Sequence, residues 1–277
     1  MNDWSLAGKR IVITGATGGI GLAAAEALAA RGAKVAIVAR SEERAAEAKR
    51  RVPGADLLLA DLSSTKSVRA LAADILARYP RLDALVNNAG GMYPDRRLSA
   101  EGHELTWAVN HLAPFLLTTL LLERLKQSAP ARIVTTSSGA HTAVSGIGFD
   151  DLACEKGFSG WRRYSESKLA NILFTKELAK RLEGTGVSAS CYHPGAVATG
   201  FGRDSKLVGF FFKWFKPFIR TPERGARTLV WLLEQPDGEA LNGGYYMDEK
   251  ARAPSRAARD EAAARKLWEV SEAATRA

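Results

Sequence analysis

Short β-branched and apolar runs alternate along the chain with longer segments rich in alanine and leucine. Some runs, such as IVITG at 11–15, are apolar without alternation, which is typical of strands covered on both faces. The segments between the runs are mostly long enough to hold a helix. This order predicts an α/β fold, a doubly wound parallel sheet with helices on both faces. The predicted strands lie at 9–15, 33–39, 55–60, 82–88, 131–138, 187–195 and 243–247.

Some of the connecting segments carry clear helical patterns. Residues 21–32 are almost all helix formers and end at Gly32, and residues 161–184 have the pattern of an amphipathic helix. Residues 110–125 place apolar side chains at helical spacing, as in a core helix or a dimer face. No internal repeat or linker rich in proline and serine divides the chain, so we expect one domain over residues 1–277.

Two irregular stretches, 139–160 and 200–222, are candidate walls of a substrate site. Loops of this kind gather beyond the carboxyl ends of parallel strands, where ligands bind. The second stretch holds an aromatic-rich run at 207–220 that admits three interpretations. It is a lid over a lipophilic substrate, a membrane contact, or ordinary packing with Lys213 and Lys216 extended toward water.

Charge and cysteine content narrow the classes of partner. The formal net charge of +9, with a pI of about 9.7, permits contact with nucleic acid or an anionic membrane. Lysine and arginine are interspersed with acids, as on solvated helix faces, and no nucleic-acid-binding motif accompanies them. Cys154 and Cys191 match neither a disulfide framework nor a metal-ligand pattern, and no leader peptide is evident. We expect no specific nucleic acid, no metal and a cytoplasmic location, with membrane contact as the lesser alternative.

A glycine-rich turn follows the first predicted strand. The sequence TGATGGIG contains Gly15, Gly19 and Gly21 and reads T-G-x-x-x-G-x-G. Glycines there let backbone N–H groups and a helix N-terminus approach a pyrophosphate, which favours a dinucleotide over a purely structural turn. Arg40 ends the next strand, where an acid would normally bind the ribose of NAD. Arg40 therefore favours NADP(H), and NAD(H) remains the alternative because two glutamates follow closely.

Tyr164 and Lys168 lie four residues apart in the sequence YSESK, so a helix places both on one face. A half-buried tyrosine beside a solvated lysine would satisfy this spacing. The alternative is a catalytic phenol. Free tyrosine, with a pKa of about 10, exchanges its proton sparingly at neutral pH, and a neighbouring ammonium would lower that pKa.

Further motifs follow one another in a fixed order along nearly the whole chain. After TGATGGIG come DLSS with Asp61, NNAG at 87–90, VNHLAPF with Asn110, IVTTSS ending at Ser138, YSESK, and HPGAVAT at 193–199. In this order the chain resembles the short-chain dehydrogenase/reductase family, whose fold is of the Rossmann type. SKLANILFTKELAKRL, HPG and the C-terminal GYYMDEKARAPSRAARD resemble most its retinol dehydrogenase and WW-domain oxidoreductase branch.

The resemblance implies a role for each matching residue. Tyr164 would donate or accept the proton, Lys168 would activate it, and Ser138 would orient the carbonyl. Asn110 would support a proton relay through water. Ser138 is preferred to Ser137 because the second serine of the family's pair is usually the catalytic one. The implied cofactor contacts are Gly15, Thr17, Gly18, Gly19, Ile20, Gly21, Arg40, Asp61, Leu62, Asn88, Ala89, Gly90, Tyr164, Lys168, Pro194, Gly195, Val197 and Thr199.

The implied activity is the NADP(H)-dependent interconversion of a carbonyl and an alcohol on a lipophilic small molecule, with Tyr164 as general acid and base. The alternative is an NADP(H)-binding sensor or scaffold with little catalysis. Family members commonly pair through long helices, which implies a homodimer or homotetramer. Membrane-bound members of the branch carry an N-terminal anchor, which we do not expect here because the first strand starts near residue 9. The histidines, His193 among them, are expected to pack locally.

Overall fold

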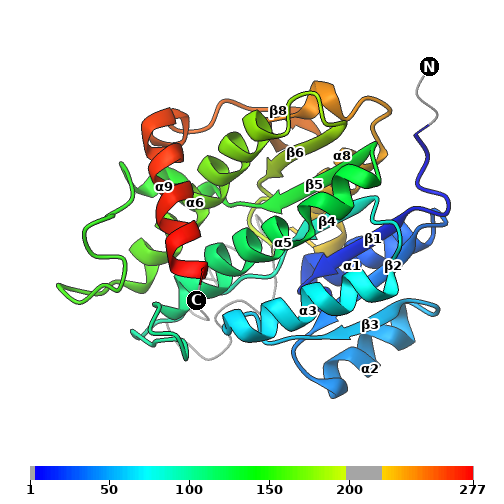
Figure 1. The fold of residues 1–277 in the computed structure, drawn as a ribbon, viewed down its shortest axis with the longest axis horizontal. Coiled ribbons are helices and arrows are strands. Elements are labelled where there is room, and N and C mark those ends of the chain that lie inside the picture. Colours follow the sequence, from blue (N-terminus) through cyan, green and yellow to red (C-terminus); the bar gives the residue numbers. More distant parts are fainter. Residues whose placement is uncertain (1–3, 198–219, 277) are drawn as a thin grey trace.

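A sheet of eight strands forms the middle layer of the described part of the chain, residues 4–197 and 220–276 of the computed structural model (Figure 1). The strand order is β3-β2-β1-β4-β5-β6-β7-β8, and neighbouring strands are parallel except β7 and β8. The strands are β1 Arg10–Thr14, β2 Lys34–Ala39, β3 Asp56–Leu59, β4 Ala84–Asn87, β5 Ala131–Thr136, β6 Val187–Tyr192, β7 Tyr245–Met247 and β8 Lys250–Ala251. The α-helices in this part are α1 Gly19–Ala29, α2 Glu42–Arg51, α3 Thr65–Arg78, α4 Leu105–Trp107, α5 Ala113–Gln127, α6 Gly160–Arg181, α8 Pro222–Glu234 and α9 Glu261–Thr275.

This arrangement confirms the predicted α/β sheet, and each predicted run contains one observed strand. Strand β8 was not predicted. It pairs with β7 through a tight turn in which Asp248 and Glu249 have φ angles of 53° and 60°. Two-residue hairpin turns of this kind are usually signalled by asparagine or glycine, so the aspartate–glutamate pair did not indicate a turn.

Helices cover both faces of the sheet. Helices α3, α5, α6 and α9 lie in front of the strands in Figure 1 and share one buried apolar cluster with them. Helices α1, α2 and α8 contribute to a second cluster on the opposite face. The sheet therefore has a core on each side, which explains why its central strands are apolar without alternation.

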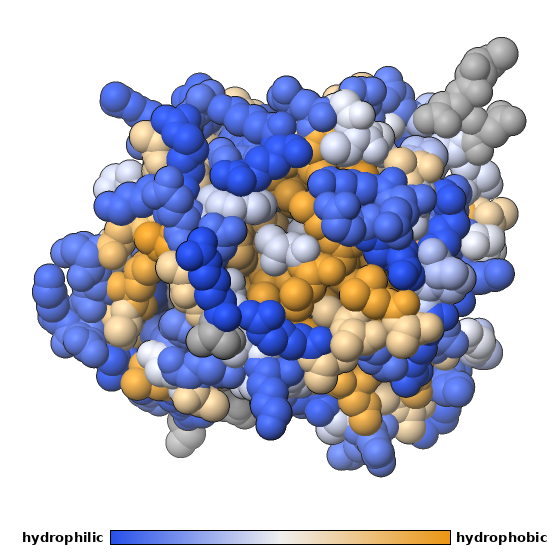
Figure 2. All heavy atoms as spheres, in the orientation of Figure 1, coloured by the Kyte–Doolittle hydropathy of each residue, from blue (hydrophilic) through white to orange (hydrophobic). Residues whose placement is uncertain are grey.

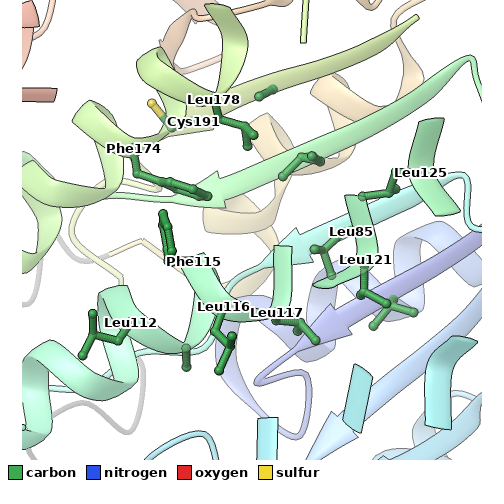
Figure 3. Packing of buried hydrophobic residues seen from close by; sticks show 14 of the residues in the cluster. Leu85, Leu112, Phe115, Leu116, Leu117, Leu121, Leu125, Phe174, Leu178 and Cys191 are labelled. Atoms are coloured by element: carbon green, nitrogen blue, oxygen red, sulfur yellow. The ribbon is translucent and has the colours of Figure 1, made fainter. Parts of the chain in front are cut away.

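The apolar stripe at 110–125 belongs to the core of the described structure. Phe115 on α5 and Phe174 on α6 point toward one another, with ring centroids 5.7 Å apart (Figure 3). Trp268 on α9 packs on both rings, at 5.0 and 6.0 Å. By length and composition the helical stretch Leu105–Gln127 could cross a membrane, but 72% of its most apolar window is buried in the fold. Those side chains pack inside the protein.

The strand order reverses beside β1, because β2 and β3 lie on one side of it and β4 and β5 on the other. The loops after β1 and β4 therefore leave the sheet side by side at the same edge. Open α/β sheets bind their ligands at such a point. The two loops are TGATGGIG and NNAG, so the fold brings the two predicted cofactor motifs together.

Candidate active site

The glycine loop between β1 and α1 is pressed against the loop that follows β4. A Cβ on Gly15 would lie 2.7 Å from Ala89 Cα, and a Cβ on Gly21 would lie 2.5 Å from Asn88 Nδ2. Gly15 also has a φ angle of 66°, a conformation that favours glycine. Any side chain at either glycine would separate the two loops.

Thr14 holds these two loops together. Its Oγ1 donates to Val86 O at 3.2 Å and accepts the N–H groups of Asn88 and Ala89 at 3.0 and 3.1 Å. Asn88 Nδ2 in turn donates to Thr14 O at 3.0 Å. Thr14 was not predicted as a supporting residue, although the threonine directly before Gly15 is part of the glycine-loop signature.

The start of α1 is open and suits a phosphate. Gly18 is the N-cap residue, and no side chain caps the helix. No described atom lies within 4 Å of the position that a Cβ on Gly18 would take. The first N–H groups of α1 have no partner inside the helix, and they lie in the same turn as Thr17 and Ile20. These residues fit the pyrophosphate of a nicotinamide dinucleotide.

The loops after β2 and β3 carry the residues that were predicted to bind the adenosine part of the cofactor. Arg40 follows β2 directly and is exposed. Asp61, after β3, accepts the N–H and the hydroxyl of Ser63 through Oδ1, at 2.9 and 2.7 Å. Its Oδ2 has no hydrogen-bond partner among the described residues and remains available to an amine. Leu62 is half-buried against the core.

The two serines after β5 have different partners. The Ser137 hydroxyl is buried and donates to Lys168 O at 2.8 Å, within the backbone of α6. The Ser138 side chain hydrogen-bonds to the Tyr164 phenol, and its Oγ also accepts the N–H of Ala140 at 3.2 Å. The geometry therefore favours Ser138 as the hydroxyl that would meet a substrate oxygen beside Tyr164.

Burial dominates the electrostatics of Tyr164 and Lys168. It raises the pKa of the phenol, and the hydrogen bond from Ser138 opposes that rise. It also lowers the pKa of the Lys168 ammonium to about 8. Lys168 Nζ lies 5.6 Å from the centre of the Tyr164 ring and donates to Thr136 O at 3.2 Å. Burial, and not the neighbouring lysine, therefore sets the direction of the phenol pKa in this structure.

Lys168 and Asn110 both face the backbone of Gly90. A Cβ on Gly90 would lie 3.2 Å from Lys168 Nζ and 3.1 Å from Asn110 Oδ1. A side chain at this position would crowd both polar groups, which is consistent with a glycine at the end of NNAG. Gly90 itself is exposed, so the ammonium lies just behind a surface that a cofactor ribose can reach.

Asn110 lies in a π-helical turn, Ala108–Leu112, between α4 and α5. Such turns are frequent at functional sites because the extra residue redirects one side chain. Asn110 Nδ2 donates to Gly91 O and Ser167 Oγ, both at 2.9 Å, while Oδ1 accepts the Gly91 N–H at 2.8 Å. Both amide protons are therefore engaged, and only Oδ1 has capacity left for a water. The predicted relay through water remains a prediction.

His193 joins the turn after β5 to the loop after β6. Its Nδ1 accepts the N–H groups of Gly139 at 3.1 Å and Gly195 at 3.3 Å. Burial and a nearby guanidinium lower the pKa of His193 to about 4, which keeps the ring neutral and able to accept both bonds. His141 Nδ1 lies 2.7 Å from Ser138 O on the other side of the turn. The expectation of local packing for His193 missed this link.

The loop after β6 carries the last predicted cofactor contacts. Pro194 and Gly195 follow His193 directly, and Val197 forms a parallel bridge with Arg220. Thr199 and nearly all of the predicted aromatic wall lie outside the described residues, so their placement stays a prediction. Among the residues that the structure covers, no group of three or more His, Cys, Asp or Glu side chains could hold a metal ion.

Comparison with known proteins gives a consistent result. A model of the family described as short chain dehydrogenase matches residues 9–207. The chain is 46% identical over 272 residues to "Retinol dehydrogenase 12" from Homo sapiens, covering 96% of this chain and 86% of that protein. A structure of an uncharacterized protein from Mycobacterium paratuberculosis is 34% identical, with a TM-score of 0.80, over 98% of this chain and 94% of the other. The "RhlG/NADP active-site complex" from Pseudomonas aeruginosa is 27% identical, with a TM-score of 0.73, over 88% and 96% of the two chains.

Proposed function

The chain belongs to the short-chain dehydrogenase family, in its retinol dehydrogenase-like branch, and we propose that it is an NADP(H)-preferring enzyme for lipophilic aldehydes or ketones. Family membership makes it an oxidoreductase that interconverts a carbonyl and an alcohol with a nicotinamide cofactor. The observation that carries the residue assignment is the buried Lys168, whose Nζ lies 5.6 Å from the centre of the Tyr164 ring and directly behind Gly90.

In the reaction that we propose, Tyr164 is the general acid for reduction and the general base for oxidation. The dinucleotide supplies the hydride when bound. As negative charge develops on the carbonyl oxygen, the Ser138 hydroxyl stabilises it by a hydrogen bond and Tyr164 gives it the phenolic proton. The raised pKa of the phenol keeps that proton on Tyr164 until an oxyanion is there to accept it.

Lys168 has an electrostatic role in this proposal. With a pKa of about 8, its side chain is still mostly cationic at pH 7. An ammonium near the Tyr164 ring stabilises the phenolate left behind by proton transfer, more strongly than it would in water because both groups are buried. The same charge lies behind Gly90, where the ribose of the cofactor would pass.

The preference for NADP(H) rests on Arg40. An exposed guanidinium directly after β2 can pair with a 2′-phosphate through two parallel hydrogen bonds, and no carboxylate occupies that position. The NADP bound by the Pseudomonas aeruginosa relative is consistent with this preference.

The proposal of a lipophilic substrate rests on the retinol in the name of the relative from Homo sapiens. A cytoplasmic location is part of the proposal, with Cys154 and Cys191 both free thiols.

The test is a titration of the purified protein with NADPH and NADH in parallel, followed by a carbonyl panel. The panel holds retinaldehyde, medium-chain aldehydes and aromatic ketones. We expect NADPH to bind at least about tenfold more tightly than NADH, because one charge-assisted hydrogen bond contributes about that much to the affinity. We also expect the protein to consume NADPH with at least one lipophilic carbonyl. Equal affinity for NADH would remove the role of Arg40. Failure to bind either nucleotide would overturn the cofactor site at the glycine loop.

A further inference from the structure

Trp161 is the most exposed large apolar side chain in residues 4–197 and 220–276, with 55% of its surface open to solvent. Leu59 and Leu98 are the others, at 49% and 47%. Isolated exposed apolar residues need no explanation. Trp161 differs from the two leucines because it contacts Tyr164 in the active site. The proposed reaction gives Trp161 no role.

The indole of Trp161 lies beside the catalytic phenol. The ring centroids of Trp161 and Tyr164 are 6.0 Å apart, with an angle of 35° between the planes. Side chains on an α-helix lean toward its N-terminus, so the phenol of Tyr164 leans over the turn that carries Trp161. Only 9% of Tyr164 is exposed. The indole therefore borders the small part of the phenol that solvent, and hence a substrate, can reach.

The backbone around Trp161 fixes the position of the indole. The first turn of α6 packs against the loop after β4: a Cβ on Gly160 would lie 2.4 Å from Tyr93 O and 3.3 Å from Pro94 Cα. Ser159 caps the helix by accepting the N–H of Arg162. A residue in a capped first turn, tied to a neighbouring loop, presents its side chain with little backbone freedom.

Two apolar residues lie in the loop that packs on the first turn of α6. Met92 and Tyr93, both half-buried, follow Gly91 in this loop. The guanidinium of Arg162, the next residue along the helix, is drawn away by its ion pair with Glu166 at 2.9 Å. Among the described residues the indole N–H makes no hydrogen bond. With 55% of its surface exposed, the side chain can be reached by a ligand.

We propose that Trp161 is a specificity-determining residue: its indole stacks on a planar, unsaturated group bonded directly to the substrate carbonyl. This inference rests on the proposed function and names the substrate feature that the site selects. An aryl or conjugated group that stacks on the indole is coplanar with its carbonyl. Stacking therefore orients the carbonyl oxygen toward Ser138 and Tyr164. A saturated ring of the same size is puckered and cannot stack. It therefore loses the part of the binding free energy that aromatic stacking adds to the burial of apolar area.

The experiment compares benzaldehyde with cyclohexanecarbaldehyde, which share a carbon skeleton and differ in planarity. The readout is the ratio of the two kcat/KM values, so that the different intrinsic reactivities of the two aldehydes cancel between proteins. We expect Trp161→Leu to lower this ratio about tenfold relative to the wild type, mainly through KM for benzaldehyde. Trp161→Phe should keep most of the ratio because it retains an aromatic ring.

Leu98→Ala serves as the matched control, since Leu98 is similarly exposed and is not part of the proposed site. We expect its ratio to equal that of the wild type. A Trp161→Leu ratio within twofold of the wild type, with both aldehydes still reduced, would overturn the stacking role and leave the proposed function standing. A wild-type protein that binds NADPH but reduces neither these aldehydes nor the wider panel would overturn the proposed function, and this inference with it.

Discussion

Burying the Lys168 ammonium costs folding free energy, and its position beside Tyr164 and Gly90 gives a reason for that cost. The side chain is 4% exposed, and its Nζ donates one hydrogen bond among the described residues, to Thr136 O. A buried cation with so little compensation is typical of functional sites, where stability and activity make opposite demands. Asn171 Nδ2 also donates to Thr136 O, at 3.1 Å, so that oxygen would keep a partner without the lysine.

We expect Lys168→Met to raise the free energy of unfolding at pH 7 by about 3 kcal/mol while it abolishes turnover. The folded-state pKa, lowered to about 8, lies below the ordinary value of 10.5, so folding buries a charged lysine at every pH below about 8. Between these two values the folded protein loses its proton first, and the cost fades. Urea denaturation of both proteins at pH 7 and pH 10 measures the difference. A gain of equal size at both pH values would contradict this account.

Single residues show where sequence reasoning reached the site and where it stopped. The helical spacing of Tyr164 and Lys168 allowed a structural or a catalytic pair, and the order of the other motifs favoured the catalytic one. The glycines of the first loop follow from their position after a strand. Thr14 and His193 did not, because their roles lie in hydrogen bonds to backbone N–H groups of distant segments. The direction of the Tyr164 pKa also required burial, which spacing within a helix does not report.

Helix α6 is anchored by a buried ionic network at its N-terminal end. Arg163, 1% exposed, pairs with Glu104 at 3.2 Å and with Glu166 at 2.9 Å, and its guanidinium lies 4.5 Å from the centre of the Trp107 ring. Glu104 also caps α4, where its carboxylate accepts two backbone N–H groups. This network joins the helix of Tyr164 to the segment that leads into the π-turn of Asn110. No local sequence pattern indicates it, since Arg163 and Glu104 lie 59 residues apart.

We expect Arg163→Met to lower the free energy of unfolding by about 3–5 kcal/mol, because it leaves two buried carboxylates without their shared cation. Arg78→Met is the matched control: it breaks the exposed pair with Asp74 and should change the free energy of unfolding far less. Chemical denaturation of the two variants and the wild type measures both changes. Equal losses in the two variants would show that burial does not set the strength of the Arg163 network.

Elements were easier to predict than their ends. Strand β5 was predicted to reach 138 but ends at Thr136, because Ser137 and Ser138 turn away to meet α6 and Tyr164. The helix predicted over 110–125 begins within the π-turn that contains Asn110. In both cases the deviation from a regular element lies at a predicted catalytic residue. Local patterning cannot predict such deviations, since tertiary contacts determine them.

The C-terminal helix changes how the whole molecule can associate. Helix α9 lies beside α6 and the start of α5 in Figure 1. Its Trp268 packs against Phe115 on α5 and Phe174 on α6. That part of the predicted dimer face is therefore covered by the chain itself. Figure 2 shows apolar side chains still gathered at the surface over α5, where Leu120 and Leu122 are half-buried. We propose that this remaining strip pairs two copies.

Light scattering on the eluting protein tests the predicted homodimer or homotetramer. We expect a mass of twice or four times the 29.8 kDa of one chain, and a shift toward 29.8 kDa in Leu120→Glu, because a carboxylate in the strip would be desolvated on pairing. Glu47→Gln, exposed on α2 at the opposite face of the sheet, should leave the mass unchanged. A wild-type protein that elutes with the mass of a single chain would contradict the predicted assembly.

The central claim is that Tyr164 transfers the proton of a carbonyl reduction, and Tyr164→Phe tests it most directly. The variant keeps the ring beside Trp161 and Lys168 and removes only the hydroxyl that pairs with Ser138. The measurement is kcat/KM for the best carbonyl of the panel, beside the affinity for NADPH. We predict NADPH binding within about threefold of the wild type and a fall in kcat/KM of about 10²–10⁴-fold, the contribution of one general acid. Undiminished reduction by the variant would contradict the assignment of Tyr164.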